Sequence, residues 1–182
     1  ALIDYGLLRD PFGGNPGAEE SDLIRQLWLD NLYTGTNFSF QKKYKNNEII
    51  LGGGSSNYDG NHFGKIIWSQ ANIEKDYKWY DLDARKQEQH LFGKWLHKYN
   101  DFHFFGDIQA RNVSYNIEGF RNNPGLKINQ KWLFINPKIG FRYSKNNNSF
   151  FASYAIANKE PNRDDFEAST TEIPKHETLN DL

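Results

Sequence analysis

The stretch that most constrains the fold runs from residue 132 to 157, where large apolar side chains recur at every second position. This period is that of a β-strand with one apolar and one polar face. The Asn-rich segment 146–148 interrupts the pattern, and Asn is common in turns because it tolerates positive φ. The sequence therefore predicts a tight antiparallel hairpin. Pro137 cannot donate to a ladder, so it predicts a bulge or a strand end nearby. The two apolar rows are Leu133, Ile135, Ile139, Phe141 and Tyr143 before the turn, and Phe150, Ala152, Tyr154 and Ile156 after it.

Similar alternation elsewhere predicts further strands, joined in turn by short Asn- and Lys-containing turns and by long polar loops. Residues 23–29 fit either a short helix or the end of a strand. We therefore predict the all-β class, as an antiparallel up-and-down sheet of about six to eight strands. The expected strands start at Leu32 for about ten residues and cover 48–58, 79–99 and 102–115, and the long loops cover about 1–21, 59–78, 120–130 and 158–175.

The composition limits the function classes. Lys plus Arg number 22 and Asp plus Glu 23, so charge does not favour binding to nucleic acid. The absence of cysteine removes disulfides and thiolate metal sites. A mean hydropathy of -0.82 without any long apolar stretch excludes a transmembrane helix, although not a membrane barrel, whose strands alternate. Because the chain begins with Ala, has no Met and shows no signal sequence, we expect it to be a piece of a longer polypeptide.

The alternation of short turns with long loops is typical of outer-membrane barrels, whose long loops lie on the extracellular side. A soluble β-sandwich can also mix its loop lengths, so this pattern leaves both architectures open.

Three segments resemble the TonB-dependent outer-membrane receptors. Residues 58–68 are similar to a strand-to-loop junction of that family, residues 151–166 to an ascending strand with its Lys-Glu-Pro-Asn segment, and residues 174–182 to the start of the next descending strand. Residues 28–31 also fit. The ordered set spans nearly the whole chain, with two departures: Asn61 stands where Asp is expected, and His176 where Pro is expected.

The resemblance implies that residues 1–182 are part of the barrel of an active transporter for siderophore-bound iron, cobalamin or a glycan, in the outer membrane of a Gram-negative cell. Such a barrel has roughly twenty-two strands closed by an N-terminal plug, to which no part of this chain is similar. The implied partners are outer-membrane lipid, a small nutrient and, through the plug, the TonB complex. An isolated fragment would expose two sheet edges and self-associate through them.

Candidate ligand-binding residues are aromatic or basic and lie in or near the expected loops, where flat amphipathic rings can stack on sugars or planar chelates. Self-packing of the loop is the alternative. One His beside Asp59 falls short of a metal site, and Asp81 and Asp83 fit rim charges. No Ser-His-Asp or Cys-His set is present, so we expect no enzyme, no metal and no cofactor. The ligand candidates are His62, Phe63, Trp68, Tyr77, Trp79, Tyr80 and Arg121.

A second set of aromatic residues lies near the short turns, where a barrel carries an aromatic girdle at the lipid interface. The alternative is the core of a soluble β-sheet, such as a carbohydrate-binding module, because both present one apolar face. The set consists of Phe38, Phe40, Trp95, Phe102, Phe104, Phe141 and Phe150.

Overall fold

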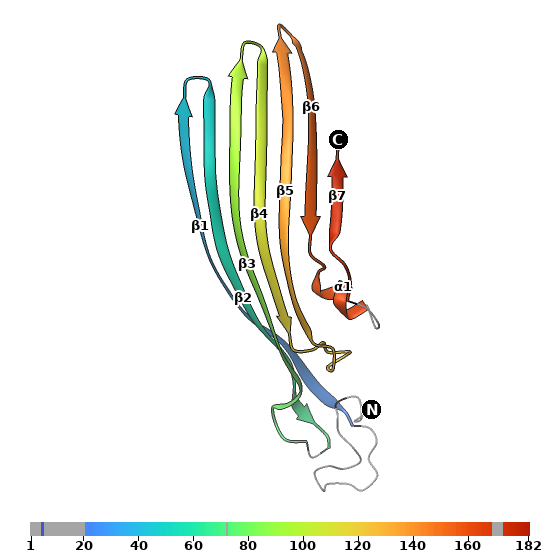
Figure 1. Cartoon of the computed structure of the whole chain (residues 1–182). Helices are drawn as coiled ribbons and strands as arrows, with labels where there is room; N and C mark the ends of the chain where they lie inside the picture. The colour runs from blue at the N-terminus through green and yellow to red at the C-terminus, as the bar shows by residue number, and fades with distance from the viewer. Residues whose placement is uncertain (1–4, 6–20, 72, 169–172) are drawn as a thin grey trace. The chain divides into compact units, whose positions relative to one another are not determined.

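The computed structural model describes residues 5, 21–71, 73–168 and 173–182, and it contains one sheet of seven antiparallel strands in chain order (Figure 1). The predicted all-β up-and-down sheet is therefore confirmed, with a strand number inside the expected range. One short helix, α1, interrupts the strand series. The elements are β1 (Leu23–Tyr44), β2 (Asn47–Ser69), β3 (Tyr77–Tyr99), β4 (Phe102–Ile117), β5 (Ile128–Lys145), β6 (Asn148–Lys159), α1 (Arg163–Ala168) and β7 (Glu177–Asp181).

The chain divides into two compact units, each built from several segments. Unit 1 consists of Ala1–Leu32, Tyr58–Arg85 and Asn116–Ile128, and unit 2 of Tyr33–Asn57, Lys86–Tyr115 and Asn129–Leu182. Ile66, Leu82, Ile117, Phe120 and Ile128 are buried in unit 1, and Val113, Phe134 and Phe166 in unit 2.

Three two-residue turns close the β1–β2, β3–β4 and β5–β6 hairpins at one end of unit 2 (Figure 1). The first residue of each turn has positive φ: 52° at Lys45, 51° at Asn100 and 51° at Asn146. Asn adopts this conformation readily, whereas Lys45 does so only because the hairpin around it imposes the turn. The predicted short turns are thus confirmed.

The predicted central hairpin is confirmed, and its two apolar rows share one face. Ile139 faces Tyr154 and Tyr143 faces Phe150, so the apolar rows of β5 and β6 lie on one face. The β5–β6 ladder ends at Lys138, directly after Pro137, although β5 itself continues through the proline. Beyond that point, the Asn158 side chain donates to the Ile135 carbonyl at 3.1 Å. The lost proline N–H is therefore accommodated at the end of a ladder.

Several predicted boundaries are wrong. Residues 23–29 form the start of β1, which is a strand of 22 residues and not of about ten. The expected loop 59–78 shrinks to residues 70–76, because β2 continues to Ser69 and β3 begins at Tyr77. The strands stay paired there because Tyr77 and Trp79 of β3 pack against the buried Ile66 of β2. The expected loop 120–130 ends earlier, since β5 begins at Ile128.

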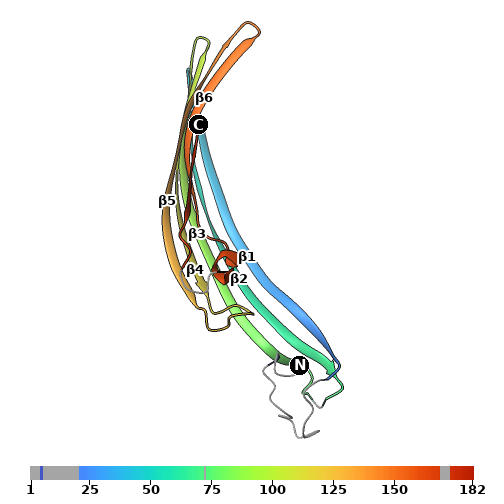
Figure 2. The ribbon, with the colours of Figure 1, turned by 90° about the vertical axis from the view of Figure 1, so that its right-hand side faces the viewer.

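The expected loop 158–175 contains the helix α1. Figure 2 shows it in a view turned by 90° from that of Figure 1. The Asn162 side chain accepts the N–H groups of Asp164 and Asp165 at 2.8 and 3.0 Å, and the Asp165 carboxylate accepts the Asn162 N–H at 2.7 Å. This reciprocal cap satisfies the first N–H groups of the helix. Phe166 then docks α1 between Tyr115 and Trp132, with ring centroids 6.0 and 6.3 Å away. The expected loop 1–21 lies outside the described residues except for Tyr5 and Ser21.

Candidate functional site

A charge cluster occupies one face of the unit 2 sheet and consists of Lys86, Glu88, His90, Arg111 and Glu160. The Arg111 guanidinium donates to both Glu88 carboxylate oxygens, at 3.2 and 3.0 Å, and to Glu160 Oε1 at 3.2 Å. Lys86 Nζ donates to the same Glu160 oxygen at 2.9 Å and lies 5.0 Å from the centre of the Tyr115 ring. Two cations and two carboxylates therefore neutralise one another across β3, β4 and the segment after β6.

Glu160 is the most buried member of the charge cluster, at 6% exposure. Burial raises the pKa of Glu160, but hydrogen bonds from Lys86 and its own backbone, with the attraction of Lys86 and Arg111, lower it more, so the net direction is downward. The second carboxylate oxygen, Oε2, is buried and has no hydrogen-bond partner among the described residues. Glu160 is thus held ionised with half of its accepting capacity unused.

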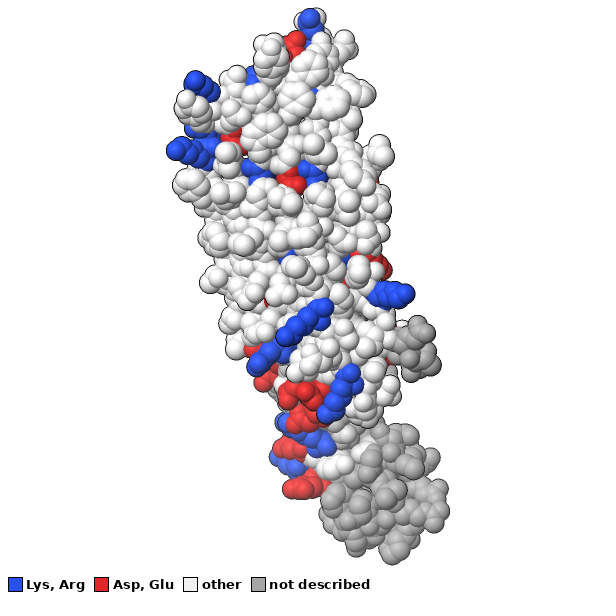
Figure 3. Space-filling model, viewed as in Figure 1, with Lys and Arg blue, Asp and Glu red and all other residues white. Residues whose placement is uncertain are grey.

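The same strands carry an apolar face on their opposite side in unit 2. Its rings and aliphatic groups touch from strand to strand: Phe104 lies 6.4 Å from Phe141, and Phe141 lies 6.0 Å from Phe150. Most of its large side chains are exposed, and the face in view in Figure 3 shows a broad area without charged residues over β3 to β6. The exposed members of this apolar face are Phe38, Phe40, Ile49, Leu51, Leu91, Trp95, Phe102, Phe104, Ile108, Leu133, Ile135, Ile139, Phe150 and Tyr154.

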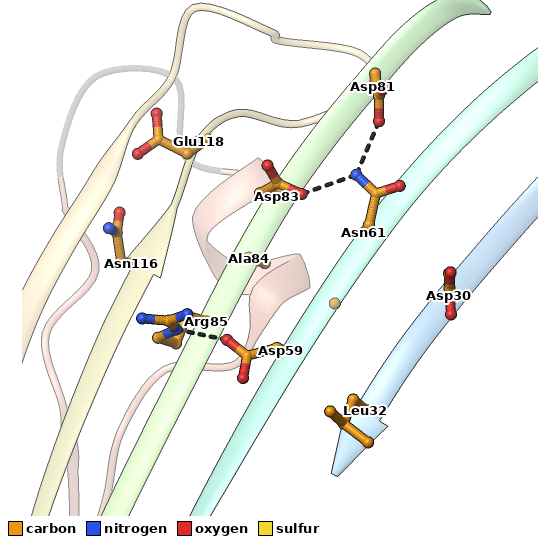
Figure 4. Close-up of a pocket in the computed structure, with 11 residues that line it drawn as sticks. Asp30, Leu32, Asp59, Asn61, Asp81, Asp83, Ala84, Arg85, Asn116 and Glu118 are labelled. Atoms are coloured by element: carbon orange, nitrogen blue, oxygen red, sulfur yellow. Dashed lines mark hydrogen bonds and ion pairs between the residues drawn. The ribbon is translucent and has the colours of Figure 1, made fainter.

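An acidic pocket of about 920 Å³ opens in unit 1 (Figure 4). Asn61 Nδ2 donates to one oxygen of Asp81 and one of Asp83, each at 2.8 Å. Lys78 binds Asp81 at 2.7 Å, and Arg85 pairs with Asp59. The carboxylates of Asp59, Asp81 and Asp83 are thus already paired with donors, which agrees with the expectation that Asp81 and Asp83 are rim charges. The occurrence of Asn at position 61, where Asp was expected, also has a physical explanation. An Asp at that position would place a third carboxylate against Asp81 and Asp83. The lining residues are Asp30, Leu32, Asp59, Gly60, Asn61, Asp81, Asp83, Ala84, Arg85, Asn116 and Glu118.

Three predicted ligand residues form a packed cluster instead of an open surface. Trp79 and Tyr80 make an edge contact at 5.3 Å, and the Tyr77 hydroxyl donates to the Tyr5 carbonyl at 3.3 Å. Tyr77 and Trp79 pack on buried Ile66. A Cβ at Gly64 would collide with both the Trp79 and Tyr80 rings, so this glycine makes room for them. These contacts agree with the self-packing alternative, and a role of the three aromatics in ligand binding stays a prediction.

The other predicted ligand residues are dispersed. Phe63 stacks on Trp28 at 5.9 Å and lies under the Lys78 ammonium at 4.3 Å. His62 Nε2 lies 3.3 Å from the Tyr58 hydroxyl. Trp68 is 53% exposed at the end of β2, and Arg121 is exposed in the β4–β5 connection.

No hydrogen bond or ring contact among the described residues joins Trp68 or Arg121 to the other predicted ligand residues. Their role in ligand binding stays a prediction.

The charge cluster was not predicted as a site from the sequence. Lys86 and Glu88 share one parity of a strand, and this regular placement of charge inside a strand was a usable signal. Glu160 follows Lys86 at a separation of 74 residues, so only the fold brings the two together.

No helix in the described parts of the chain has the length and hydropathy needed to cross a bilayer. Within those same parts, no group of three or more His, Asp or Glu side chains is placed to hold a metal ion.

The fold is similar to a solved structure described as "Copper transporter OprC". The TM-score is 0.62 with 10% sequence identity, over 76% of this chain and 23% of that chain. At this identity the likeness shows the fold alone. The sheet therefore shares the antiparallel all-β fold of the matched part of that structure. No protein-family model matches the chain, and no curated protein matches it.

Proposed function

We propose that this chain is part of an outer-membrane receptor that takes up a scarce nutrient with energy supplied by the TonB complex. The observation that carries this proposal is the pair of opposite faces in unit 2. One face holds the charge cluster, and the other exposes rows of large apolar side chains. Exposing this apolar face to water is unfavourable in free energy, whereas contact with lipid hydrocarbon avoids that cost.

The soluble carbohydrate-binding module is the weaker candidate. A soluble sheet buries its apolar row in a core, as paired sheets of a sandwich do. In the described chain the apolar row is exposed, while Glu160 of the charge cluster is buried, which is the arrangement of a barrel with lipid outside and a polar interior.

The proposed partner of the apolar face is outer-membrane lipid. The resemblance to TonB-dependent receptors adds a small nutrient on the long connections and the TonB complex through a plug in the full-length protein. Trp68 and Arg121 are the predicted ligand residues whose exposure suits contact with a nutrient. The nutrient class is siderophore-bound iron, cobalamin or a glycan. Copper, named for the similar structure, belongs among the substrates to be assayed.

The first experiment locates the full-length protein. It should be recovered from the detergent-extracted outer-membrane fraction, and recovery only from the soluble fraction would contradict the proposal.

A second experiment uses single cysteines in the full-length protein. Leu91→Cys on the apolar face should react with a membrane-dissolved maleimide, whereas its neighbour variant His90→Cys, on the opposite face, should not. Equal labelling of both would contradict the assigned faces.

A third experiment measures uptake of each labelled nutrient in cells with and without TonB. Loss of uptake in the TonB-deficient cells is expected for the true substrate. TonB-independent uptake would leave a barrel transporter of another energy class.

A further inference from the structure

The polar face of unit 2, which holds the charge cluster, carries further cations toward the hairpin turns. Lys94 and Lys98 have the same strand parity as the charge-cluster residues of β3. Lys138 and Arg142 share one parity of β5, and Lys138 Nζ lies 5.9 Å from the centre of the Phe105 ring. Phe105 has the parity of the charge-cluster residue of β4, so all four cations lie on the polar face.

These four cations make no ion pair with any residue in the described part of the chain. Asp107 and Asp181 have the parity of the polar face, and among the described residues neither pairs with a cation. Glu48 is already paired with Lys43 at 3.5 Å. The charge cluster neutralises itself, whereas the half of the polar face near the hairpin turns keeps an excess of positive charge.

Two aromatic rings of the polar face lean across the neighbouring strands. A Cβ at Gly52 would come within 2.5 Å of the Phe92 ring, and a Cβ at Gly140 within 2.5 Å of the Phe105 ring. Each ring therefore occupies the space that a glycine leaves on the next strand. Because these rings project little from the sheet, a second layer of protein can approach it closely.

Apolar side chains are also exposed on the polar face. Phe151 faces Arg142 across β5 and β6 and is 74% exposed. Leu179 faces Ala157 across β6 and β7 and is 63% exposed. Lipid on the apolar face would not cover these two side chains. Exposed apolar groups beside cations without ion-pair partners fit contact with a protein surface better than contact with water or an inorganic anion.

We propose that this half of the polar face docks a protein layer that bears carboxylates and apolar side chains, and that this layer is an acidic surface of the plug. The inference rests on the proposed function, in which the full-length protein has a plug. It adds the chemistry and the place of the contact between that plug and these strands. The docking face consists of Phe92, Lys94, Lys98, Phe105, Lys138 and Arg142.

The test treats the full-length protein in detergent with a carbodiimide, which joins an amine to a carboxylate in direct contact with it. Mass spectrometry of the digested protein should then find Lys94, Lys98 or Lys138 linked to Asp or Glu residues of the plug. This measurement needs no variant, so it decides the question even where a substitution prevents assembly.

The docking variant Lys94→Gln/Lys98→Gln/Lys138→Gln should lose these cross-links. Its plug should also become sensitive to protease at a lower urea concentration than the wild-type plug. The variant Lys94→Arg/Lys98→Arg/Lys138→Arg keeps the positive charge, so its plug should stay as resistant as that of the wild type, although carbodiimide no longer couples these positions.

The matched control removes three exposed lysines of unit 2 that have the parity of the apolar face, as Lys42→Gln/Lys131→Gln/Lys145→Gln. It should keep both the plug cross-links and the protease resistance of the plug. Equal sensitivity of the control and the docking variant would overturn the docking face. Cross-links from the docking face only to carboxylates within residues 1–182 would also overturn it.

Outer-membrane recovery and TonB-dependent uptake are measured on the same preparations. A protein that is recovered from the outer membrane and transports its nutrient, yet gives no plug cross-link from the docking face, would overturn this inference alone. A protein that is absent from the outer membrane would overturn the proposed function instead.

Discussion

Arg111 and Glu88 face each other across β4 and β3 through two hydrogen bonds of 3.2 and 3.0 Å. The same guanidinium also reaches Glu160, which is nearly fully buried. One arginine therefore supports two carboxylates, and its removal would leave Glu88 without its main partner and Glu160 with only Lys86.

Replacing Arg111 by Ala should destabilise the protein by about 3 kcal/mol, because it leaves the buried Glu160 and the half-buried Glu88 carboxylates with insufficient compensation. The matched variant Arg85→Ala removes an exposed arginine paired with Asp59 and should change stability by less than about 1 kcal/mol. Guanidinium unfolding of the full-length protein in detergent measures both. Equal losses of unfolding free energy in the two variants would show that the charge cluster stabilises the protein no more than an exposed ion pair does.

Glu160 should make stability depend on acid pH. Its pKa in the folded protein is lowered, so its stabilising contribution is complete above its unfolded pKa of roughly 4.3 and is lost as pH falls through the lower folded pKa. Glu160→Gln should lower stability at neutral pH and flatten the pH dependence below about pH 5. Unfolding curves at a series of pH values measure this, with exposed Glu177→Gln as the control. An unchanged slope in Glu160→Gln would contradict the prediction.

Phe166 should anchor α1 to the sheet. Its ring is 1% exposed between Tyr115 and Trp132, so Phe166→Ala should destabilise the protein or at least this segment by about 3 kcal/mol through the cavity left behind. Limited proteolysis should then cut within residues 160–168. Phe151→Ala, which truncates a ring that is 74% exposed, is the control and should leave the segment resistant.

Asn61→Asp should weaken unit 1 at neutral pH. The change is nearly isosteric, but it replaces a donor that binds Asp81 and Asp83 by a third carboxylate, with an expected loss of about 1–2 kcal/mol. Thermal unfolding at pH 7 measures the loss, and Asn116→Asp in the lining of the same pocket is the comparison. A stability equal to that of the wild type would show that the Asn61 bridge contributes nothing.

Ile139→Arg should impair assembly into the outer membrane, because it places a charge on the apolar face, which the proposed function assigns to lipid, at an expected loss of about 2 kcal/mol. Ser153→Arg places the same charge on the opposite face, next to Gly140, and should be tolerated better. The yield of each full-length variant in the outer-membrane fraction is the measurement. Equal yields would argue against lipid on the apolar face.

Local chemistry in the sequence determined the class of this fold. The period-two alternation of Leu133 to Tyr143 and the turn at Asn146 depend only on neighbouring residues, so the hairpin and the apolar face of its strands could be predicted. The aromatic residues near the turns could likewise be placed on one face. Whether lipid or a core covers that face could not be decided by alternation, since both need the same pattern.

Only the tertiary structure decided which distant residues meet. Residues 59–69 were expected to lie in a loop, yet they extend β2 because β3 pairs with it and because Trp79 packs beside Gly64. The same packing brings the predicted ligand aromatics Tyr77, Trp79 and Tyr80 together. Glu160 meets Lys86 and Arg111 from separations of 74 and 49 residues. Such contacts depend on strand register and on the docking of α1, which are properties of the whole sheet and not of any segment.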